Sequence, residues 1–449
     1  MGTGPVGGVG RDLVVVGAGA AGLWAAAVAA RAGLSVLLLE KTPRAGTKVL
    51  ASGGTRCNLT TTLDARAAAE LFGREGARFL APAFRALSPL DLRERFAALG
   101  VVTVEESLEK VFPKSGSARE VRDALQREAL AAGAEIRVGA AVVRIAPIGD
   151  RAGSGGWEVV LEDAAVVRGA RLVLCPGGKS YARTGTTGDG YPWLEELGLP
   201  IVEPVPALVP LASPAAWVRE LAGVSLQEVE ARLADPEGRV LGKRRRPVLF
   251  THQGVSGPGA MDLSAPVARA EAAAARRAKK APVHHLLLDL LPELSREAVR
   301  ELLVEAAGRP GAPSLVRVLP VGIARRVIDA VSLQAGLGAI DPRVNGLDRE
   351  SRHRLVESLK GLDVPVDGTL GFDKAEVTAG GLALTHVDPG TMRVRGFENL
   401  YACGEILDLQ GPIGGLNFQS AFATAEVAAR DAARAAGAPT RPPARRSTR

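Results

Sequence analysis

The sequence predicts an α/β fold built on a parallel sheet. Three observations indicate it: a run of four apolar residues suited to a buried strand, Leu13–Val16, then a Gly-rich turn, then an Ala-rich helical stretch that ends at Gly33. A second apolar strand, Ser35–Leu39, follows and closes on Glu40. Strand, turn, helix and strand within about 30 residues have the size of one βαβ unit, whose two strands lie parallel.

The uncharged run at residues 13–30 is about as long as the shortest membrane-spanning helix, roughly 17 residues. Its internal order, a strand followed by a turn and a helix, favours a buried globular unit over a membrane span. A signal peptide is not favoured either, because residues 1–10 carry no basic side chain and Arg31 replaces the expected cleavage region. We therefore expect no membrane segment and a cytoplasmic protein.

The turn reads GAGAAG, residues 17–22, which is the G-x-G-x-x-G pattern. Gly17 permits a tight turn, Gly19 lets the backbone approach a pyrophosphate, and Gly22 lets the helix pack on the strand. The helix N-terminus offers N–H groups and a partial positive charge to that phosphate. Glu40, at the end of the second strand, can accept a hydrogen bond from a ribose hydroxyl. The context predicts dinucleotide binding, and the motif alone does not choose between NAD and FAD.

Length and cysteine content limit the class of protein. At 449 residues the chain exceeds the size of one hydrophobic core, so two or three domains are expected. Cys57, Cys175 and Cys403 lie far apart in the sequence and form no C-x-x-C motif. This spacing argues against a disulfide scaffold and against a dithiol redox pair, and it fits a reducing cytoplasm. No metal site is predicted.

The positive charge of the chain does not by itself indicate nucleic-acid binding. The net charge is +7, but residues 440–449 hold four arginines and no acid, which leaves 7 − 4 = +3 for the rest. The basic runs KRRR (243–246) and RRAKK (276–280) are better interpreted as solvated faces, because no aromatic residues interleave with them. We expect residues 436–449 to form a disordered basic tail.

Beyond the first unit, the pattern changes twice along the chain. Helices are expected at residues 89–99 and, after a Ser117 cap, at 118–132, with strands near 135–145, 157–161 and 171–174. A Gly/Thr-rich loop, Cys175 to Tyr191, follows. From about Pro204 the strands are punctuated by proline, a helix capped by Ser295 is expected at 295–307, and strands return from Gly371. We infer a second domain between these two changes.

The C-terminal segment favours FAD over NAD. No second G-x-G-x-x-G turn lies between an apolar strand and a helix, where it could hold a nicotinamide nucleotide. Asn399–Cys403 is strand-like, Gly404 and Glu405 make a close-approach turn, and the Gly-rich loop Gly411–Gly415 leads into a helix expected near Asn417. The positive end of that helix is suited to stabilise negative charge on a reduced flavin ring.

Four spaced motifs carry a family resemblance: GAGAAG with GGTRCNLT, then LVLCPGGKSYARTGTTGDGY, then LFTHQGVSGP, then TAGGLALTHVDPGTMRVRGFENLYACGEILDLQGPIGGLNFQSAFATA. Together they resemble the BaiN/aminoacetone-oxidase family of bacterial FAD flavoproteins, from about Asp12 to Ala428. The resemblance implies a Rossmann-like FAD-binding domain interrupted by an insert domain with a β-barrel-like part and a helical part. We place the FAD-binding domain at residues 11–204 and 371–435, and the insert at 205–370, β-rich over 205–290 and helical over 291–362.

The resemblance also implies a set of cofactor-binding residues. The first glycines would line the pyrophosphate, Glu40 would flank the adenosine ribose, Val143 would use its backbone near the adenine, and Glu405 would lie beside the ribitol. The sequence departs from the family at Thr55, Leu416 and Ser420, where a glycine, an aromatic residue and a tryptophan are usual, and this puts the substrate pocket in doubt. The full implied set is Gly17, Gly19, Ala21, Gly22, Glu40, Lys41, Lys48, Ser52, Gly53, Gly54, Arg56, Cys57, Asn58, Val143, Gly177, Gly178, Gly404, Glu405, Gly415, Leu416, Asn417 and Phe418.

Three residues are candidates for catalysis. Arg183 in the Gly/Thr loop is suited to clamp a carboxylate or a carbonyl oxygen, and Tyr181 beside it is either a proton donor or a packing residue. His252 is suited to relay a proton near neutral pH, although a histidine in a Gly-rich turn often only binds backbone groups.

The sequence predicts an FAD-dependent oxidoreductase that acts on a small molecule. The expected donor is NAD(P)H or an organic compound, and the expected acceptor is an enone-like substrate or dioxygen. Two alternatives stay open: a flavoprotein that acts on or binds RNA, and a flavin sensor without turnover. The sequence predicts no oligomeric state.

Overall fold

The computed structural model describes residues 10–311, 313–320, 322–338 and 341–438. The described chain divides into two units, residues up to Pro204 together with those from Glu376 in the first, and Val205–Ala375 in the second. The chain leaves the first unit within strand β11 (Ile201–Ala207) and re-enters it just before β21 (Val377–Leu382). The return lies a few residues after the position expected from the sequence, Gly371. The basic tail predicted at residues 436–449 lies mainly at 439–449, outside the described residues.

A five-stranded parallel sheet is the core of the first unit, in the order β22-β10-β1-β2-β6. The predicted strand–turn–helix–strand unit is confirmed: β1 spans Leu13–Val16, the helix α1 spans Ala20–Arg31 and β2 spans Val36–Leu39. All four residues of β1 and of β2 are buried, as expected of strands covered on both faces.

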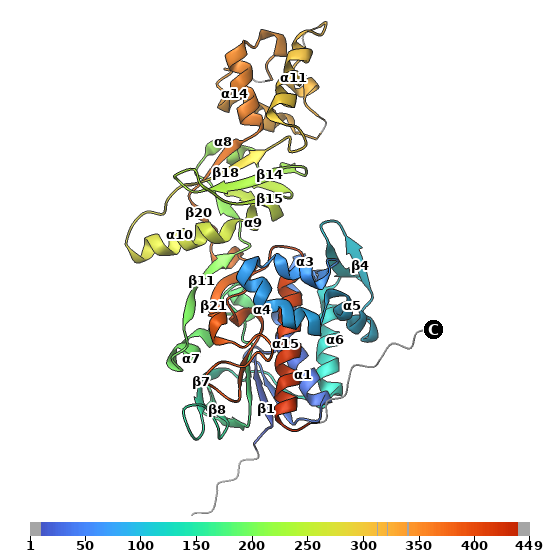
Figure 1. The fold of residues 1–449 in the computed structure, drawn as a ribbon, viewed down its shortest axis with the longest axis vertical. Helices are drawn as coiled ribbons and strands as arrows, with labels where there is room; N and C mark the ends of the chain where they lie inside the picture. Colours follow the sequence, from blue (N-terminus) through green and yellow to red (C-terminus); the bar gives the residue numbers. More distant parts are fainter. Residues whose placement is uncertain (1–9, 312, 321, 339–340, 439–449) are drawn as a thin grey trace, which may run out of the picture. The chain divides into compact units, whose positions relative to one another are not determined.

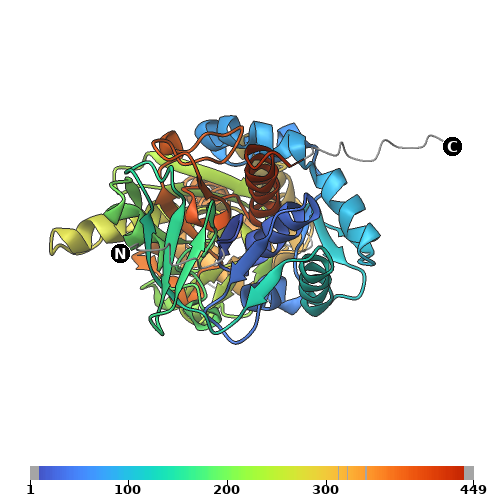
Figure 2. The same cartoon turned by 90° about the horizontal axis from the view of Figure 1, so that it is seen from below.

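Two segments distant in sequence complete this sheet. The strand β10 (Leu172–Leu174) pairs with β1, and β22 (Leu400–Ala402) pairs with β10. The helix α15 (Leu416–Ala435) follows β22 and packs on α1, which also contacts α6 (Ala118–Ala131). Figures 1 and 2 show α1 lying between these two helices. The dinucleotide-binding unit is therefore assembled from both ends of the chain.

The remaining elements of the first unit surround the parallel sheet. Most of the predicted elements are present, but the strand expected over residues 135–145 is two strands, β6 and β7. The Ser117 prediction is wrong in one respect, because its side chain caps no N–H of α6. The first-unit elements not yet given are α2 (Thr47–Ala51), β3 (Thr60–Thr61), α3 (Ala65–Glu70), α4 (Gly73–Ala86), α5 (Pro89–Ala98), β4 (Thr103–Glu106), β5 (Lys110–Pro113), β6 (Glu135–Arg137), β7 (Val142–Pro147), β8 (Trp157–Leu161), β9 (Val166–Gly169) and α7 (Gly190–Glu196).

The second unit combines two antiparallel sheets with a group of helices. One sheet has the order β13-β16-β17-β12-β20 and the other β15-β14-β18-β19. Ser295 caps α11 as predicted, since its side chain accepts the Ala298 N–H. The elements are β12 (Leu211–Ala212), α8 (Ala216–Glu220), β13 (Ser225–Leu226), β14 (Glu230–Ala234), β15 (Val240–Arg245), β16 (Val248–Thr251), β17 (Gly254–Ser256), α9 (Pro258–Met261), α10 (Ser264–Arg276), β18 (His284–Asp289), α11 (Arg296–Ala307), α12 (Leu315–Val318), α13 (Arg325–Gln334), α14 (Arg349–Leu359), β19 (Leu362–Val366) and β20 (Gly368–Thr369).

Each unit has its own hydrophobic core. The first core joins the parallel sheet to α1 and α15, and the second joins the sheets of the insert to α11, α13 and α14. In the part of the chain that the structure describes, no helix combines the length and the apolar character that a membrane span requires.

Candidate functional site

The turn between β1 and α1 has the geometry of a phosphate cradle. Gly17 has φ +99°, and a Cβ there would lie 2.5 Å from the Cys175 carbonyl oxygen. A Cβ on Gly22 would lie 1.8 Å from the Gly17 carbonyl oxygen, so both glycines are required by packing. A Cβ on Gly19 would meet no heavy atom within 4 Å. Gly19 therefore borders open space at the N-terminus of α1, where N–H groups and the helix dipole favour an anion.

Glu40 is fastened to this turn by its side chain. Its Oε2 accepts the Ala18 N–H at 2.9 Å, and its Oε1 accepts the N–H and the hydroxyl of Thr42, each at 2.8 Å. The Glu40 carbonyl oxygen accepts the Ala140 N–H at 2.8 Å. Val143, close to Ala140 in sequence, lies at a register shift between β7 and β8 and is half exposed. A carboxylate oxygen can accept more than one hydrogen bond, so Glu40 retains acceptor capacity for a ribose hydroxyl.

Glu405 is the centre of a hydrogen-bonded cluster formed by four segments. Lys48 forms an ion pair with it, and the Ser180 hydroxyl lies 3.2 Å from Oε1. The Thr378 N–H donates to the same oxygen at 2.9 Å, and Lys48 Nζ donates to Ser180 Oγ at 2.7 Å. Gly404 immediately before it has φ +74°, and a Cβ there would lie 3.0 Å from the Ala21 Cβ of α1. The Glu405 carboxylate is thus held in one orientation beside the phosphate turn.

The Gly/Thr loop lies against the residues that follow β2. Lys41 forms an ion pair with Asp189 and donates to the Thr187 hydroxyl at 2.6 Å. A Cβ on Gly177 would lie 2.6 Å from Thr186 Cγ2, and one on Gly178 would lie 2.3 Å from Thr378 Oγ1. These two glycines, predicted as cofactor ligands, are already required by packing inside the protein.

The stretch Ser52–Asn58 holds a strained backbone. Gly53, Gly54, Thr55 and Cys57 all have positive φ, between 54° and 71°. A Cβ on Gly53 would lie 2.9 Å from the Asn58 N atom, whereas one on Gly54 would meet open space. Positive φ is unfavourable for Thr55 in particular, since it is β-branched. Strain of this kind gathers at ligand sites, where the surrounding structure maintains it.

The side chains of this stretch bind the β4–β5 hairpin. Arg56 forms an ion pair with Glu106, and its guanidinium lies 4.2 Å from the centre of the Phe112 ring. The Asn58 Oδ1 accepts the Val111 N–H at 3.3 Å. Both groups were predicted to hydrogen-bond the flavin, and in the structure they bind protein groups.

The loop before α15 brings backbone to the same region. Gly415 has φ +80° and precedes the first residue of the helix, Leu416, one residue before the position expected from the sequence. The Asn417 side chain binds both the N–H and the carbonyl oxygen of Gly411, at 2.8 and 2.9 Å. Leu416 is buried, and the Phe418 ring stacks 6.0 Å from that of Phe422. The long helix thus presents its N-terminus from a loop that its own side chains fix.

The three catalytic candidates have different surroundings. Arg183 is exposed and has no ion pair or hydrogen bond with another described residue. Tyr181 is half-buried, and burial together with the nearby charge of Glu376 raises the pKa of its phenol. His252 is exposed in the turn between β16 and β17 of the second unit. Arg183 and Tyr181 share one loop of the first unit, and the role of all three in catalysis stays a prediction.

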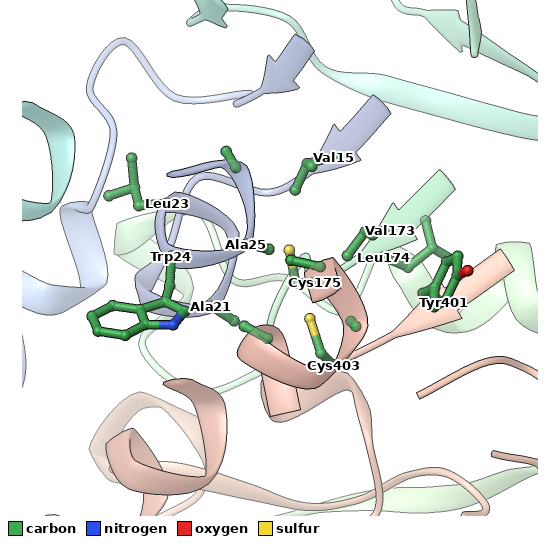
Figure 3. Close-up of a cluster of buried hydrophobic side chains, with 14 of the residues drawn as sticks. Val15, Ala21, Leu23, Trp24, Ala25, Val173, Leu174, Cys175, Tyr401 and Cys403 are labelled. Atoms are coloured by element: carbon green, nitrogen blue, oxygen red, sulfur yellow. The ribbon is translucent and has the colours of Figure 1, made fainter. Parts of the chain in front are cut away.

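A pair of thiols is the feature that reasoning from the sequence missed. Cys175 and Cys403 lie side by side after two neighbouring strands, and Figure 3 shows their side chains close together. Their separation in sequence hid this proximity. Both cysteines are free and buried, so the expectation that they form no redox pair stays a prediction. Within the described residues, no group of three or more His, Cys, Asp or Glu side chains is arranged to hold a metal ion.

The residues present fit an extended dinucleotide. Gly19 borders open space, the Glu40 carboxylate is fixed to the same turn, and Glu405 follows Gly404, which lies against Ala21 of α1. A second helix N-terminus, at Leu416, comes from the C-terminal segment. These are the groups by which FAD-binding folds hold phosphate, ribose and ribitol.

Comparisons with known proteins agree with this geometry. The family model for the HI0933-like protein Rossmann domain matches residues 11–431. The chain is 29% identical to the ribosomal RNA dihydrouridine synthase of Escherichia coli (strain K12), over 94% of this chain and 97% of that protein. It is also 29% identical to the 3-dehydro-bile acid delta(4,6)-reductase of Clostridium scindens, over 93% of this chain and 98% of that protein.

Solved structures show the same fold. The 3-ketosteroid-delta4-(5alpha)-dehydrogenase from Rhodococcus jostii RHA1 aligns with a TM-score of 0.50 at 16% identity, over 94% of this chain and 96% of that one. The family match spans nearly the whole described chain, including both segments of the parallel sheet and the insert between them. The chain therefore belongs to the HI0933-like Rossmann family, and it is an FAD-dependent oxidoreductase.

Proposed function

We propose that this protein reduces a carbon–carbon double bond conjugated with a carbonyl group, using electrons that NAD(P)H delivers to FAD. The names of two relatives support this chemistry. One is a delta(4,6)-reductase of a 3-dehydro bile acid, and the other makes dihydrouridine. Dihydrouridine differs from uridine by a saturated ring double bond that was conjugated with a carbonyl, so both names describe the same type of reduction.

The observation that carries the proposal is the guanidinium of Arg183, which is exposed and binds no other described residue. FAD, when bound, supplies hydride transfer. Arg183 would donate hydrogen bonds to the carbonyl oxygen of the substrate and draw electron density from the conjugated double bond. Tyr181 keeps its proton at neutral pH, because a phenol ordinarily loses it only near pH 10 and burial raises this pKa further, so it can act as a second donor.

The test is reduction followed by reoxidation in the absence of air. The visible absorbance of the flavin is followed while NADH or NADPH is added, and the reduced protein is then mixed with a cyclic enone, with its saturated ketone, or with dioxygen. We expect a nicotinamide nucleotide to reduce the flavin. Of the two organic compounds, the enone should reoxidise the flavin and the saturated ketone should not. Reoxidation by dioxygen but not by the enone would favour an oxidase and contradict the proposal.

A matched pair of variants tests the role of Arg183. Loss of a charge-assisted hydrogen bond costs about 1.5–3 kcal/mol, so Arg183→Met should slow reoxidation by the enone by roughly 10- to 150-fold. Reduction of the flavin by NAD(P)H should not change. Arg74→Met, which removes an exposed arginine from α4, is the control and should leave both steps unchanged. Equal effects in the two variants would remove Arg183 from the proposal.

A second candidate substrate is a uridine within RNA, which is favoured by the name of the E. coli relative. The basic run at the end of β15 gives it no further support. Lys243 pairs with Glu230, Arg244 and Arg246 lie 3.7 Å from the Asp262 carboxylate, and Arg245 pairs with Glu293. A four-residue basic run whose members each have an acidic partner leaves little charge for phosphates.

RNA is tested as an acceptor in the same assay. An unmodified ribosomal RNA transcript is added to the reduced protein at physiological salt, and the RNA is analysed for a gain of about 2 Da at uridine. Reoxidation by the transcript but not by the free enone would replace the first candidate with the second. Failure of every acceptor after successful reduction would favour the sensor without turnover.

A further inference from the structure

Two of the three buried thiols lie at the same level of the parallel sheet. Cys175 follows the last residue of β10 and Cys403 follows the last residue of β22. The residues before them, Leu174 and Ala402, are paired in register, and the Cys403 N–H donates to the Leu174 carbonyl oxygen at 3.0 Å. Neighbouring positions of adjacent strands bring two Cα atoms within the range that a disulfide can bridge.

The Cys175 thiol is in direct contact with the phosphate turn. Its Sγ lies 3.3 Å from the carbonyl oxygen of Val16 and 3.5 Å from that of Gly17. A Cβ on Gly22 would lie 3.1 Å from this sulfur. Figure 3 shows both sulfur atoms beside α1, at the level of Ala21 and Ala25. Any movement of this sulfur therefore reaches the backbone that forms the cradle.

We propose that Cys175 and Cys403 are an oxidative modification site, and that their conversion to a disulfide lowers the affinity of the protein for FAD. The oxidant is a hydroperoxide. One hydrogen peroxide molecule accepts two electrons from the two thiols, both S–H bonds and the O–O bond break, an S–S bond forms and two water molecules leave. The inference requires that FAD binds, and it is independent of the donor and acceptor proposed above.

The disulfide would change the cradle through close packing. The sulfurs of a disulfide lie about 2.05 Å apart, nearer than two separate thiols can approach. Because β22 and β1 lie on opposite sides of β10, a bond to Cys403 draws Cys175 Sγ away from the Val16 and Gly17 carbonyl oxygens. The turn cannot adjust freely, because backbone atoms occupy the space beside Gly17 and Gly22 where a Cβ would lie. In a closely packed protein interior, the shift of one side chain moves the atoms that surround it. By linkage, bound FAD opposes formation of the disulfide to the same extent.

In the folded protein, burial makes the Cys175 and Cys403 thiols resistant to oxidation. The hydrogen bond with Cys403, together with burial, holds the pKa of the Cys175 thiol well above its usual value. Thiolate is the reactive form, so the pair reacts slowly while both side chains stay buried. We expect the protein without FAD to be oxidised faster, since local opening of the turn is then easier.

The experiment compares the FAD-bound protein with the protein after FAD removal, each exposed to hydrogen peroxide. Peptide mass mapping should find the Cys175 and Cys403 peptides joined, with a loss of about 2 Da, faster in the protein without FAD. Titration with FAD, followed by flavin fluorescence, should show at least roughly tenfold weaker binding after oxidation. Dithiothreitol should restore the affinity.

Single alanine variants identify the thiols. Cys175→Ala and Cys403→Ala should each keep their FAD affinity through peroxide treatment. If only one of the two variants folds well, that variant alone is sufficient for the test. The double variant Cys175→Ala/Cys403→Ala is the control for other oxidation: it keeps Cys57, the third buried cysteine, and its FAD affinity should not respond to peroxide. Single-residue sulfinic acids without a joined peptide, a disulfide that leaves FAD affinity unchanged, or a peroxide-dependent loss of affinity that persists in the double variant would each overturn the inference.

Discussion

Gly19 and Gly22 belong to the same turn and have different surroundings, which makes them a matched pair of sites for substitution. A methyl group on Gly19 enters open space, and its φ of −77° and ψ of −164° suit alanine. A methyl group on Gly22 would lie 1.8 Å from a backbone carbonyl oxygen. We therefore expect Gly19→Ala to affect the cofactor alone and Gly22→Ala to affect the protein itself.

The magnitudes follow from these surroundings. Alanine at the N-cap position of Gly19 costs roughly 0.5–1 kcal/mol of helix capping, and the smaller entropy of the unfolded chain returns about 0.4–1 kcal/mol. The free energy of unfolding without FAD should thus change by less than about 0.5 kcal/mol. Loss of one hydrogen bond to a pyrophosphate oxygen costs about 1.5–3 kcal/mol, or 10- to 150-fold in Kd. Gly22→Ala should lose about 1–3 kcal/mol or more of stability, because backbone must move.

Two measurements separate the variants. Thermal unfolding of the protein without FAD reports stability, and fluorescence titration with FAD reports affinity. Gly19→Ala should unfold with the parent and bind FAD weakly, whereas Gly22→Ala should unfold earlier. The reasoning is refuted if Gly19→Ala binds FAD as tightly as the parent, or if it is destabilised as much as Gly22→Ala.

Three further changes test other features of the fold. Thr55→Gly should raise the free energy of unfolding by ~0.5–1 kcal/mol in denaturant titrations, because it relieves a φ of +71°; a lower stability would contradict the strain. Glu426→Ala should lower the free energy of unfolding by about 3–5 kcal/mol, since this buried carboxylate pairs with two arginines and accepts an indole N–H. Glu70→Ala, at an exposed pair, should lower it by less than about 0.5 kcal/mol, and equal losses in the two variants would contradict this reasoning. Hydrogen bonds from Ser35 lower the pKa of Asp12, so their stabilisation is present above the unfolded pKa near 3.9 and is lost as pH falls through the folded pKa. Ser35→Ala should flatten the acid side of a stability profile, and an unchanged profile would refute this assignment.

Local signals in the sequence predicted the strand–turn–helix unit and its glycines. Gly17 and Gly22 could be interpreted from the motif because part of the reason is local: Gly17 has a positive φ, and a Cβ on Gly22 would meet the Gly17 carbonyl oxygen within the same turn. Ser295 was recognised as a cap for the same reason. Ser117 shows the limit of such signals, because a suitable residue type in the right place makes no capping bond.

Contacts between distant segments could not be predicted from the sequence. The cluster at Glu405 joins residues from four places in the chain, and no spacing rule indicates that Lys48 and Ser180 meet there. The thiol pair was missed for the same reason, since Cys175 and Cys403 become neighbours only when β22 joins β10. Single residues in a motif were found more readily than the partners that orient them.

The position of β22 at the edge of the parallel sheet has a consequence for synthesis of the protein. During translation β10 emerges more than two hundred residues before β22 can cover it, so its edge hydrogen-bonding groups wait unpaired while the insert is being made. Contacts of such long sequence separation form slowly, and the indole of Trp24 finds its acceptor, Glu426, only after nearly the whole chain has left the ribosome. The nascent first unit is therefore a natural client for chaperones, and truncations within α15 should leave an aggregating chain that cannot retain its flavin.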